Sequence, residues 1–191
     1  MKRHITLARS ITLEHPEDPA MTFARRLLLV LFVLVSCVGC DQATKSIATS
    51  RLPLAQTRSY LGDTVRLQLM HNEGAFLSVG ASLPKAWRQG LLRLGVACML
   101  AGLLAAALFF APPRHAPVVA LSLMFAGGAS NLIDRFVNDG YVVDFLNLGI
   151  GPLRTGIFNV ADMALMLGVF MLLLGSVRHR QVPDARHRSA E

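Results

Sequence analysis

The stretch Ala116-Pro-Val-Val-Ala-Leu-Ser-Leu-Met-Phe-Ala-Gly-Gly-Ala-Ser-Asn-Leu-Ile133 carries no charge and is followed at once by Asp134 and Arg135. Its length is close to the minimum for an α-helix that crosses a bilayer. Three more apolar segments of similar length occur in the chain, so the sequence predicts a bundle of four membrane-spanning helices. The predicted spans are about residues 24–47, 90–113, 116–134 and 156–177.

The composition excludes an ordinary soluble domain. Of the 191 residues, 53% are apolar and only 16% are charged, and the mean hydropathy is +0.47. The net charge of +7 is not gathered in one soluble patch, because the basic residues lie between the apolar segments and at the ends of the chain. We therefore expect membrane lipids as partners, and no nucleic acid.

The ends of the chain differ in character from its middle. Residues 1–21 are polar and are predicted to be a disordered extension, since Met21 precedes a more membrane-like start. Residues 22–177 form the predicted four-span domain, and residues 178–191 a basic tail. We expect this to be one compact domain that acts as a monomer.

The positions of the arginines predict the orientation in the membrane. Arg25 and Arg26 stand at the start of the first span, and Arg178 and Arg180 follow the fourth. Since cytoplasmic flanks carry an excess of positive charge, both termini are predicted to be cytoplasmic. The loops 46–88 and 135–156 then lie on the outer side.

The two outer loops are long enough to fold. The segment Val65-Arg-Leu-Gln-Leu69 alternates strictly between apolar and polar residues, which is typical of a half-buried strand. The segment 141–146 can pair with it, although no register can be deduced. The predicted fold class is therefore an all-α membrane protein, a four-transmembrane-helix bundle with a small extracytoplasmic β-sheet on the membrane surface.

The common signatures of metal and cofactor sites are missing from the sequence. The three cysteines all fall within apolar segments, and the six histidines are scattered along the chain. There is no G-x-S-x-G, no P-loop and no dinucleotide fingerprint. We expect neither a metal nor a cofactor.

Polar groups at membrane depth are costly and by default indicate a functional site. Here they gather at the outward ends of the first, third and fourth spans. They are Asp41, Lys45, Asn131, Asp134, Arg135, Asp144, Asn159 and Asp162. Two Asn-x-x-Asp repeats, at 131–134 and 159–162, each place an amide and a carboxylate on one helical face.

Five short boxes in this order resemble those of the bacterial lipoprotein signal peptidases, also called type II signal peptidases. The boxes are Asp41-Gln-Ala-Thr-Lys45, His71-Asn72-Glu-Gly74-Ala-Phe76, Gly127-Gly-Ala-Ser-Asn131-Leu-Ile-Asp134-Arg135, Val142-Val-Asp144-Phe145 and Phe158-Asn159-Val-Ala-Asp162. The resemblance covers about residues 22–177. It implies an aspartyl endopeptidase of the bacterial inner membrane whose active site faces the periplasm. Its substrates would be prolipoproteins, cleaved just before a diacylglyceryl-modified cysteine.

The resemblance also implies roles for individual residues. Asp144 and Asp162 would form the catalytic pair. Four residues would orient the substrate and the pair, namely Asn72, Asn131, Arg135 and Asn159. Asp41 and Lys45 would belong to the supporting polar shell. The chain departs from the family pattern at Ser130, where glycine is usual, and in the Asn72 box, which is one residue shorter than its commonest form.

The implied chemistry is reasonable for two nearby carboxylates. In a partly desolvated site they share one proton, because both cannot ionise easily. The ionised member can deprotonate a water that attacks the scissile carbonyl, while the protonated member hydrogen-bonds the carbonyl oxygen. The sequence does not say which aspartate takes which role.

Structural interpretations of the same residues stay open at this point. Asp134 with Arg135, and Asp41 with Lys45, could be structural ion pairs. Asp162 could simply cap the fourth helix, and Asn131 and Asn159 could make interhelical hydrogen bonds. The alternative function is a small non-enzymatic transporter or proton-conducting bundle, which also places polar groups inside a membrane.

Overall fold

The computed structural model describes residues 21–73, 84–112 and 114–180. The predicted extension, apart from Met21, and the part of the tail beyond Arg180 lie outside the described residues. Met21 itself is buried, at 8% exposed, in an apolar cluster with Val30 and Val118.

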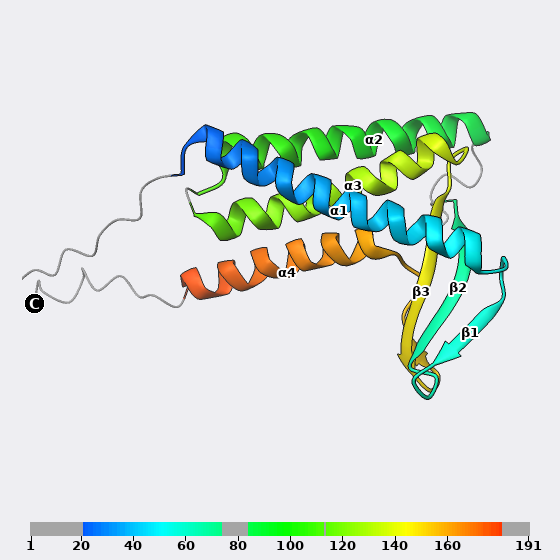
Figure 1. The fold of residues 1–191 in the computed structure, drawn as a ribbon. Coiled ribbons are helices and arrows are strands. Elements are labelled where there is room, and N and C mark those ends of the chain that lie inside the picture. The colour runs from blue at the N-terminus through cyan, green and yellow to red at the C-terminus, as the bar shows by residue number, and fades with distance from the viewer. Residues whose placement is uncertain (1–20, 74–83, 113, 181–191) are drawn as a thin grey trace, which may run out of the picture.

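The prediction of four spanning helices is confirmed (Figure 1). The helices are α1 (Phe23–Arg51), α2 (Lys85–Ala105), which ends in the π turn η2 (Ala106–Phe110), α3 (His115–Val137) and α4 (Val160–Arg180). All four contain a stretch long and apolar enough to cross a membrane. The chain is therefore a multi-pass membrane protein.

The fourth helix starts later than predicted. We predicted a start near residue 156, but α4 begins at Val160. The reason is that Phe158 forms a bridge with Leu146 of the sheet, which keeps the preceding residues extended. This shift places Asp162 in the first turn of α4.

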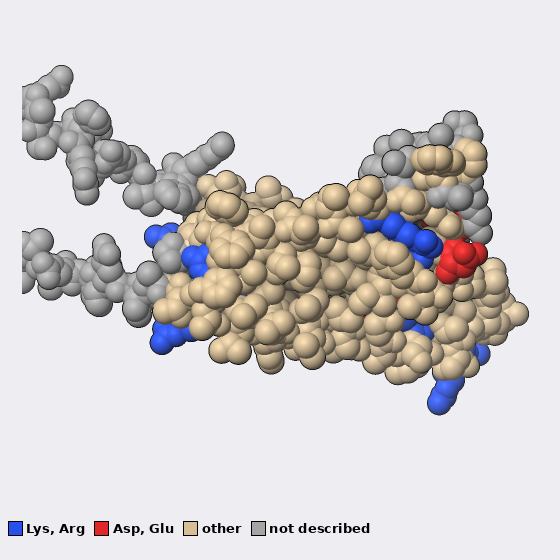
Figure 2. Space-filling model, turned by 90° about the horizontal axis from the view of Figure 1, so that it is seen from above, with Lys and Arg blue, Asp and Glu red and all other residues tan. Residues whose placement is uncertain are grey.

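The helices lie side by side with the sheet at one end (Figure 1). The beginning of α1 and the end of α4 lie together at the opposite end. On the face shown in Figure 2, the coloured charges gather at the two ends and the middle is uncharged. This distribution fits a bundle whose middle lies in hydrocarbon.

Close contact between α3 and α4 depends on glycine. A Cβ at Gly127 would collide with the carbonyl oxygen of Ala161, and one at Gly168 would lie 2.5 Å from the carbonyl oxygen of Ala120. Without side chains at these two positions the helix backbones approach closely, as is common in lipid. The outward end of α3 is thereby held against the first turn of α4.

The sheet has four antiparallel strands in the order β1-β2-β3-β4. The strands are β1 (Thr57–Tyr60), β2 (Val65–Asn72), β3 (Val142–Ile150) and β4 (Leu153–Arg154). The predicted strand at 65–69 and its pairing with 141–146 are both confirmed. The structure adds the register, with Val65 opposite Leu148 and Asn72 opposite Val142.

An irregularity between Leu67 and Met70 shifts the β2–β3 register. Beyond it, Met70 lies opposite Asp144, and a bulge of this kind commonly redirects side chains beside functional sites. The inner part of the sheet is anchored by Leu69 and Phe145, which pack with Ala48 of α1 and with Leu52, the residue that follows α1. Asp144 is therefore carried on a strand that is fixed against the end of the helix bundle.

Candidate active site

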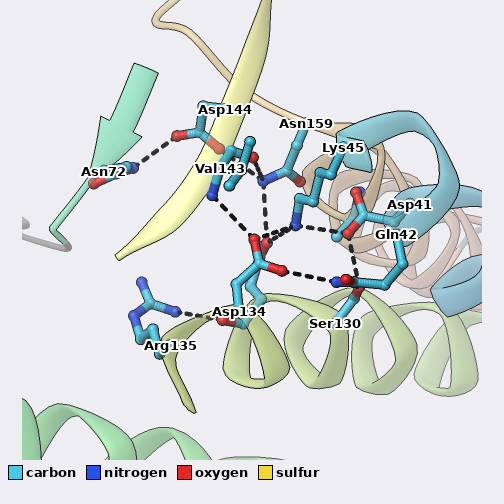
Figure 3. A network of polar contacts seen from close by, with 12 residues as sticks. Asp41, Gln42, Lys45, Asn72, Ser130, Asp134, Arg135, Val143, Asp144 and Asn159 are labelled. Carbon is cyan, nitrogen blue, oxygen red and sulfur yellow. Dashed lines mark hydrogen bonds and ion pairs between the residues drawn. The ribbon is translucent and has the colours of Figure 1, made fainter. Parts of the chain in front are cut away.

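Asp144 lies near the beginning of β3 and is 2% exposed. Its Oδ2 accepts a hydrogen bond of 2.9 Å from Nδ2 of Asn72, and its Oδ1 accepts one of 2.7 Å from Nδ2 of Asn159 (Figure 3). Two strands and the residue before α4 therefore hold this carboxylate. Burial raises the pKa of Asp144 from 3.8 to about 6, while the hydrogen bond from Asn72 acts in the opposite direction and the charge of Asp162 adds to the rise.

Asp162 is half-buried and forms a reciprocal cap with Asn159 at the start of α4. The backbone N–H of Asp162 donates to Oδ1 of Asn159 at 2.9 Å, and Oδ2 of Asp162 accepts from the backbone N–H of Asn159 at 3.2 Å. This arrangement is a capping box in which asparagine and aspartate take the two positions. Asp162 therefore does cap α4, as one interpretation of the sequence proposed. The cap uses only Oδ2 of Asp162, and Oδ1 accepts a hydrogen bond from Asn131.

Asn159 connects the two carboxylates. It is fully buried, its amide contacts Asp144, and its backbone N–H contacts Asp162. Its Nδ2 also lies 3.0 Å from Oδ1 of Asn131, whose own Nδ2 donates to Oδ1 of Asp162 at 2.8 Å. The interhelical hydrogen bonds expected of Asn131 and Asn159 are therefore present and end on the predicted catalytic pair.

Lys45 of α1 supports the hydrogen-bonded network around Asn131 with a buried positive charge. It is 3% exposed, and its Nζ lies 2.6 Å from Asp41, 2.9 Å from Asp134 and 3.0 Å from Oδ1 of Asn131. All three ammonium protons thus have an acceptor. Buried ions in a membrane require such full pairing, because each unpaired one is costly.

Asp41 and Asp134 extend the network to backbone groups of other elements. Asp41 Oδ1 accepts from the backbone N–H of Ala161 at 2.9 Å, which adds a further cap to α4. Asp134 Oδ2 accepts from the backbone N–H of Val143 at 3.0 Å, next to Asp144. The predicted supporting shell thereby fixes both segments that carry Asp144 and Asp162.

Asp134 does not pair with its sequence neighbour Arg135, which corrects one structural interpretation of the sequence. Its ion pair is with Lys45, and no ion pair joins Asp134 to Arg135, whose side chains are both described. Neighbouring helical residues point in different directions, which is the physical reason. Nη1 of Arg135 lies 3.4 Å from the carbonyl oxygen of Asn131, and its buried Nε has no hydrogen-bond partner.

Two members of the network were not predicted from the sequence. The Nε2 of Gln42 donates to Asp134 at 2.7 Å and to Ser130 Oγ at 3.1 Å, and Ser130 Oγ donates to Asp41 at 2.7 Å. Gln42 directly follows Asp41 in the same box, so its place in the sequence could have indicated that it belongs to the network. Ser130 is fully buried and directs its hydroxyl to α1.

His71 contributes an aromatic contact at the edge of the site. Its ring stacks on that of Tyr141 with centroids 4.1 Å apart. Within residues 21–73, 84–112 and 114–180, no group of three or more His, Cys, Asp or Glu side chains is arranged to hold a metal ion. Residues 74–76 of the Asn72 box lie outside the described residues.

The sequence matches one protein family over most of its length. Residues 33–178 match the family described as signal peptidase (SPase) II. The lipoprotein signal peptidase of Mycobacterium avium is 33% identical over 173 residues, which cover 85% of this chain and 89% of the relative. That of Moorella thermoacetica is 35% identical over 147 residues, covering 76% of this chain and 88% of the relative.

The fold is also similar to solved structures. One bacterial membrane enzyme has a TM-score of 0.65 and 26% identity, with 82% of this chain and 95% of the other covered. A second has a TM-score of 0.68 and 25% identity, with 90% and 96% covered.

Proposed function

The chain belongs to the signal peptidase II family and is a protease that removes signal peptides from prolipoproteins, and we propose that Asp144 and Asp162 are the aspartyl pair that performs the cleavage. The observation that carries this proposal is Asn159, which hydrogen-bonds both carboxylates. A residue placed in this way holds the two groups in one site. The alternative of a non-enzymatic transporter or proton-conducting bundle is not favoured, because the relatives are peptidases.

The environment of each aspartate suggests its role. Burial raises the pKa of Asp144 to about 6, so we assign the shared proton to Asp144. Asp162 then acts as the base that takes a proton from the attacking water. The protonated Asp144 donates to the carbonyl oxygen as negative charge develops there, and a proton from the pair passes to the leaving amine.

The surrounding amides keep the pair in a reactive geometry. Asn72 and Asn159 hold Asp144, and Asn131 holds Asp162. Arg135 lies close enough to interact electrostatically with both aspartates, and its Nε has no partner, so we assign it to the orientation of the substrate. Asp41 and Lys45 act through these groups as positioning residues.

We propose a diacylglyceryl-modified prolipoprotein as substrate, with cleavage just before the lipidated cysteine. Asp162 stands in the first turn of a spanning helix, a depth that a lipid-anchored cysteine can reach. The enzyme is a monomer in the bacterial inner membrane, in contact with lipids, with both termini cytoplasmic and the site periplasmic. The arginines at the start of α1, Arg25 and Arg26, and those that follow Val177 support this orientation.

The test is cleavage of a defined substrate by the purified protein in detergent. A diacylglyceryl-modified prolipoprotein should release its signal peptide, and the unmodified form run in parallel should be cleaved far more slowly. Equal cleavage of both forms would contradict the proposed lipid requirement. No cleavage of either form by the folded protein would contradict the proposed site.

A further inference from the structure

The far end of the sheet carries an apolar surface that no part of the described chain covers. We define the hairpin tip as Tyr60 and Leu61, at the β1–β2 turn, with Ile150 and Leu153, at the β3–β4 turn. Leu61 and Ile150 are both 78% exposed, and Leu153 is 81% exposed. The outward residues of the spans show a similar value, as Phe32 is 70% exposed. The tip thus exposes apolar side chains to the same degree as helix surfaces that face lipid.

The two turns are fixed to each other. The backbone N–H of Gly149 donates to the carbonyl oxygen of Thr64 at 3.0 Å, and Nη1 of Arg154 donates to the carbonyl oxygen of Asp63 at 2.7 Å. Asp63 also accepts two hydrogen bonds from Arg66. The tip is therefore one ordered surface and not two independent loops.

The backbone conformation at Leu61 is energetically unfavourable for leucine. Its φ is +50°, a left-handed conformation that suits glycine or asparagine and that leucine rarely adopts. A polar residue or glycine would satisfy the turn without exposing an apolar side chain to water. The presence of leucine at this position indicates that the apolar side chain itself is used.

The position of the tip beside the helix bundle indicates that its partner is lipid. β4 is one of the two edge strands, and the chain passes from it towards α4, a spanning helix. In Figure 1 the sheet extends sideways from the end of the bundle and reaches beyond α4. The turns at the far end of the sheet thus lie beyond α4, on the side where lipid surrounds a spanning helix.

The charges next to the tip also suit a phospholipid surface. Arg66 and Arg154 share the single carboxylate of Asp63. These two guanidinium groups exceed the one carboxylate. An excess of basic groups beside apolar side chains is the pattern by which a surface binds phosphate headgroups and inserts between them.

From these observations we propose that the hairpin tip inserts into the outer leaflet and is a second membrane anchor besides the four spans. β3 carries both Ile150 and Asp144, so this anchor would hold the carboxylate at a fixed height against the membrane. That consequence rests on the proposed function. Insertion of the tip does not, and it can be measured without any substrate.

The experiment uses the fluorescence of one tryptophan in the full-length protein. The chain has a single tryptophan, Trp87, so Trp87→Phe with Leu153→Trp places the only reporter at the tip. The matched control carries Thr57→Trp, which is exposed on β1 away from the tip. Both proteins are reconstituted in vesicles of phosphatidylcholine and phosphatidylglycerol, with or without bromine on the acyl chains.

We expect the tip reporter to emit at shorter wavelength and to lose intensity in brominated lipid. The control should be quenched by acrylamide from the aqueous phase and hardly by bromine. A second reporter, Leu61→Trp, tests the other turn and replaces the first should Leu153→Trp fail to fold. Equal acrylamide quenching at tip and control, with no effect of bromine, would overturn the proposal. A tip signal that disappears on dilution of the protein with lipid would also overturn it, because the partner would then be a second copy.

Discussion

Lys45 donates a hydrogen bond of 3.0 Å to Oδ1 of Asn131, and this contact decides which way the Asn131 amide faces. With its oxygen held by the ammonium group, the amide must present its NH2 group to the other side, where Nδ2 meets Asp162 at 2.8 Å. A cation on α1 therefore orients a carboxylate on α4 through an amide on α3.

Asp144→Asn and Asp162→Asn should each reduce prolipoprotein cleavage by about 10²–10⁴-fold or more, because asparagine keeps the shape but cannot share the proton. The double variant should be no worse than either single one. The measurement is single-turnover peptide release by protein shown to be folded. Asp139→Asn is the matched control, since Asp139 is exposed and has a φ of +49°, which asparagine tolerates. Appreciable turnover by either of the first two variants would eliminate the aspartyl pair.

Asn159→Ser should separate capping from catalysis. Serine retains an oxygen that can cap α4 but has no amide for Asp144, so the protein should stay folded while activity falls. Asn159→Ala removes both functions and should in addition lose about 1 kcal/mol of stability. Thermal unfolding and peptide release are compared for the two variants. Full activity in Asn159→Ser would show that the amide contact with Asp144 is dispensable.

Lys45→Met should destabilise the fold more than Asp134→Asn. Loss of the ammonium group leaves the carboxylates of Asp41 and Asp134 facing each other without a cation, a situation that costs roughly 3–5 kcal/mol. Asp134→Asn leaves the pair of Lys45 with Asp41 intact and should retain some turnover. Denaturant-induced unfolding in detergent measures the difference in stability between the two variants. Equal stability of the two variants would contradict the central role given to Lys45.

The activity should decline as the pH rises above about 6. Burial raises the pKa of Asp144 to about 6, so above this pH the pair loses its shared proton and with it the acid. Asn72→Leu removes a hydrogen bond that favours the ionised form, so the pKa should rise and the decline should move to higher pH. The pH profile of kcat/KM gives both values, and an unmoved or lowered profile in Asn72→Leu would contradict the assignment.

The same pKa predicts how stability depends on pH. A carboxyl whose pKa is higher in the folded state binds more protons there, so its contribution to stability is complete below about pH 4 and is lost as the pH rises through about 6. Asp144→Asn should abolish this part of the dependence. Thermal unfolding across this pH range, for the wild type and the variant, provides the comparison.

Reporter fusions should place both ends of the bundle in the cytoplasm. Fusions before Thr22 and after Val177 are expected to report a cytoplasmic position, and a fusion within the β1–β2 turn a periplasmic one. The reason is that four spans return the chain to the side on which it started. A periplasmic signal after Val177 would be incompatible with an even number of crossings.

Much of the architecture can be predicted from local patterns. Uncharged segments such as 116–133 had to become helices, because a lipid environment allows no unsatisfied backbone groups. The alternation at 65–69 predicted a strand. Both conclusions depend on residues close together in the sequence, where period and composition carry the information. The proposal of Asp144 and Asp162 rests instead on the resemblance of five short boxes to one family.

The partners of the polar residues could not be predicted in this way. Asp134 lies next to Arg135 in the sequence, yet it pairs with Lys45 of another helix. Ser130 is 89 positions from Asp41 in the sequence, yet its hydroxyl binds that carboxylate. The start of α4 moved to Val160 because Phe158 pairs with a distant strand. The physical reason is the same in all three cases: burial of a charge or a backbone group requires a partner, and packing of the helices and the sheet, which brings distant segments together, decides which partner is within reach.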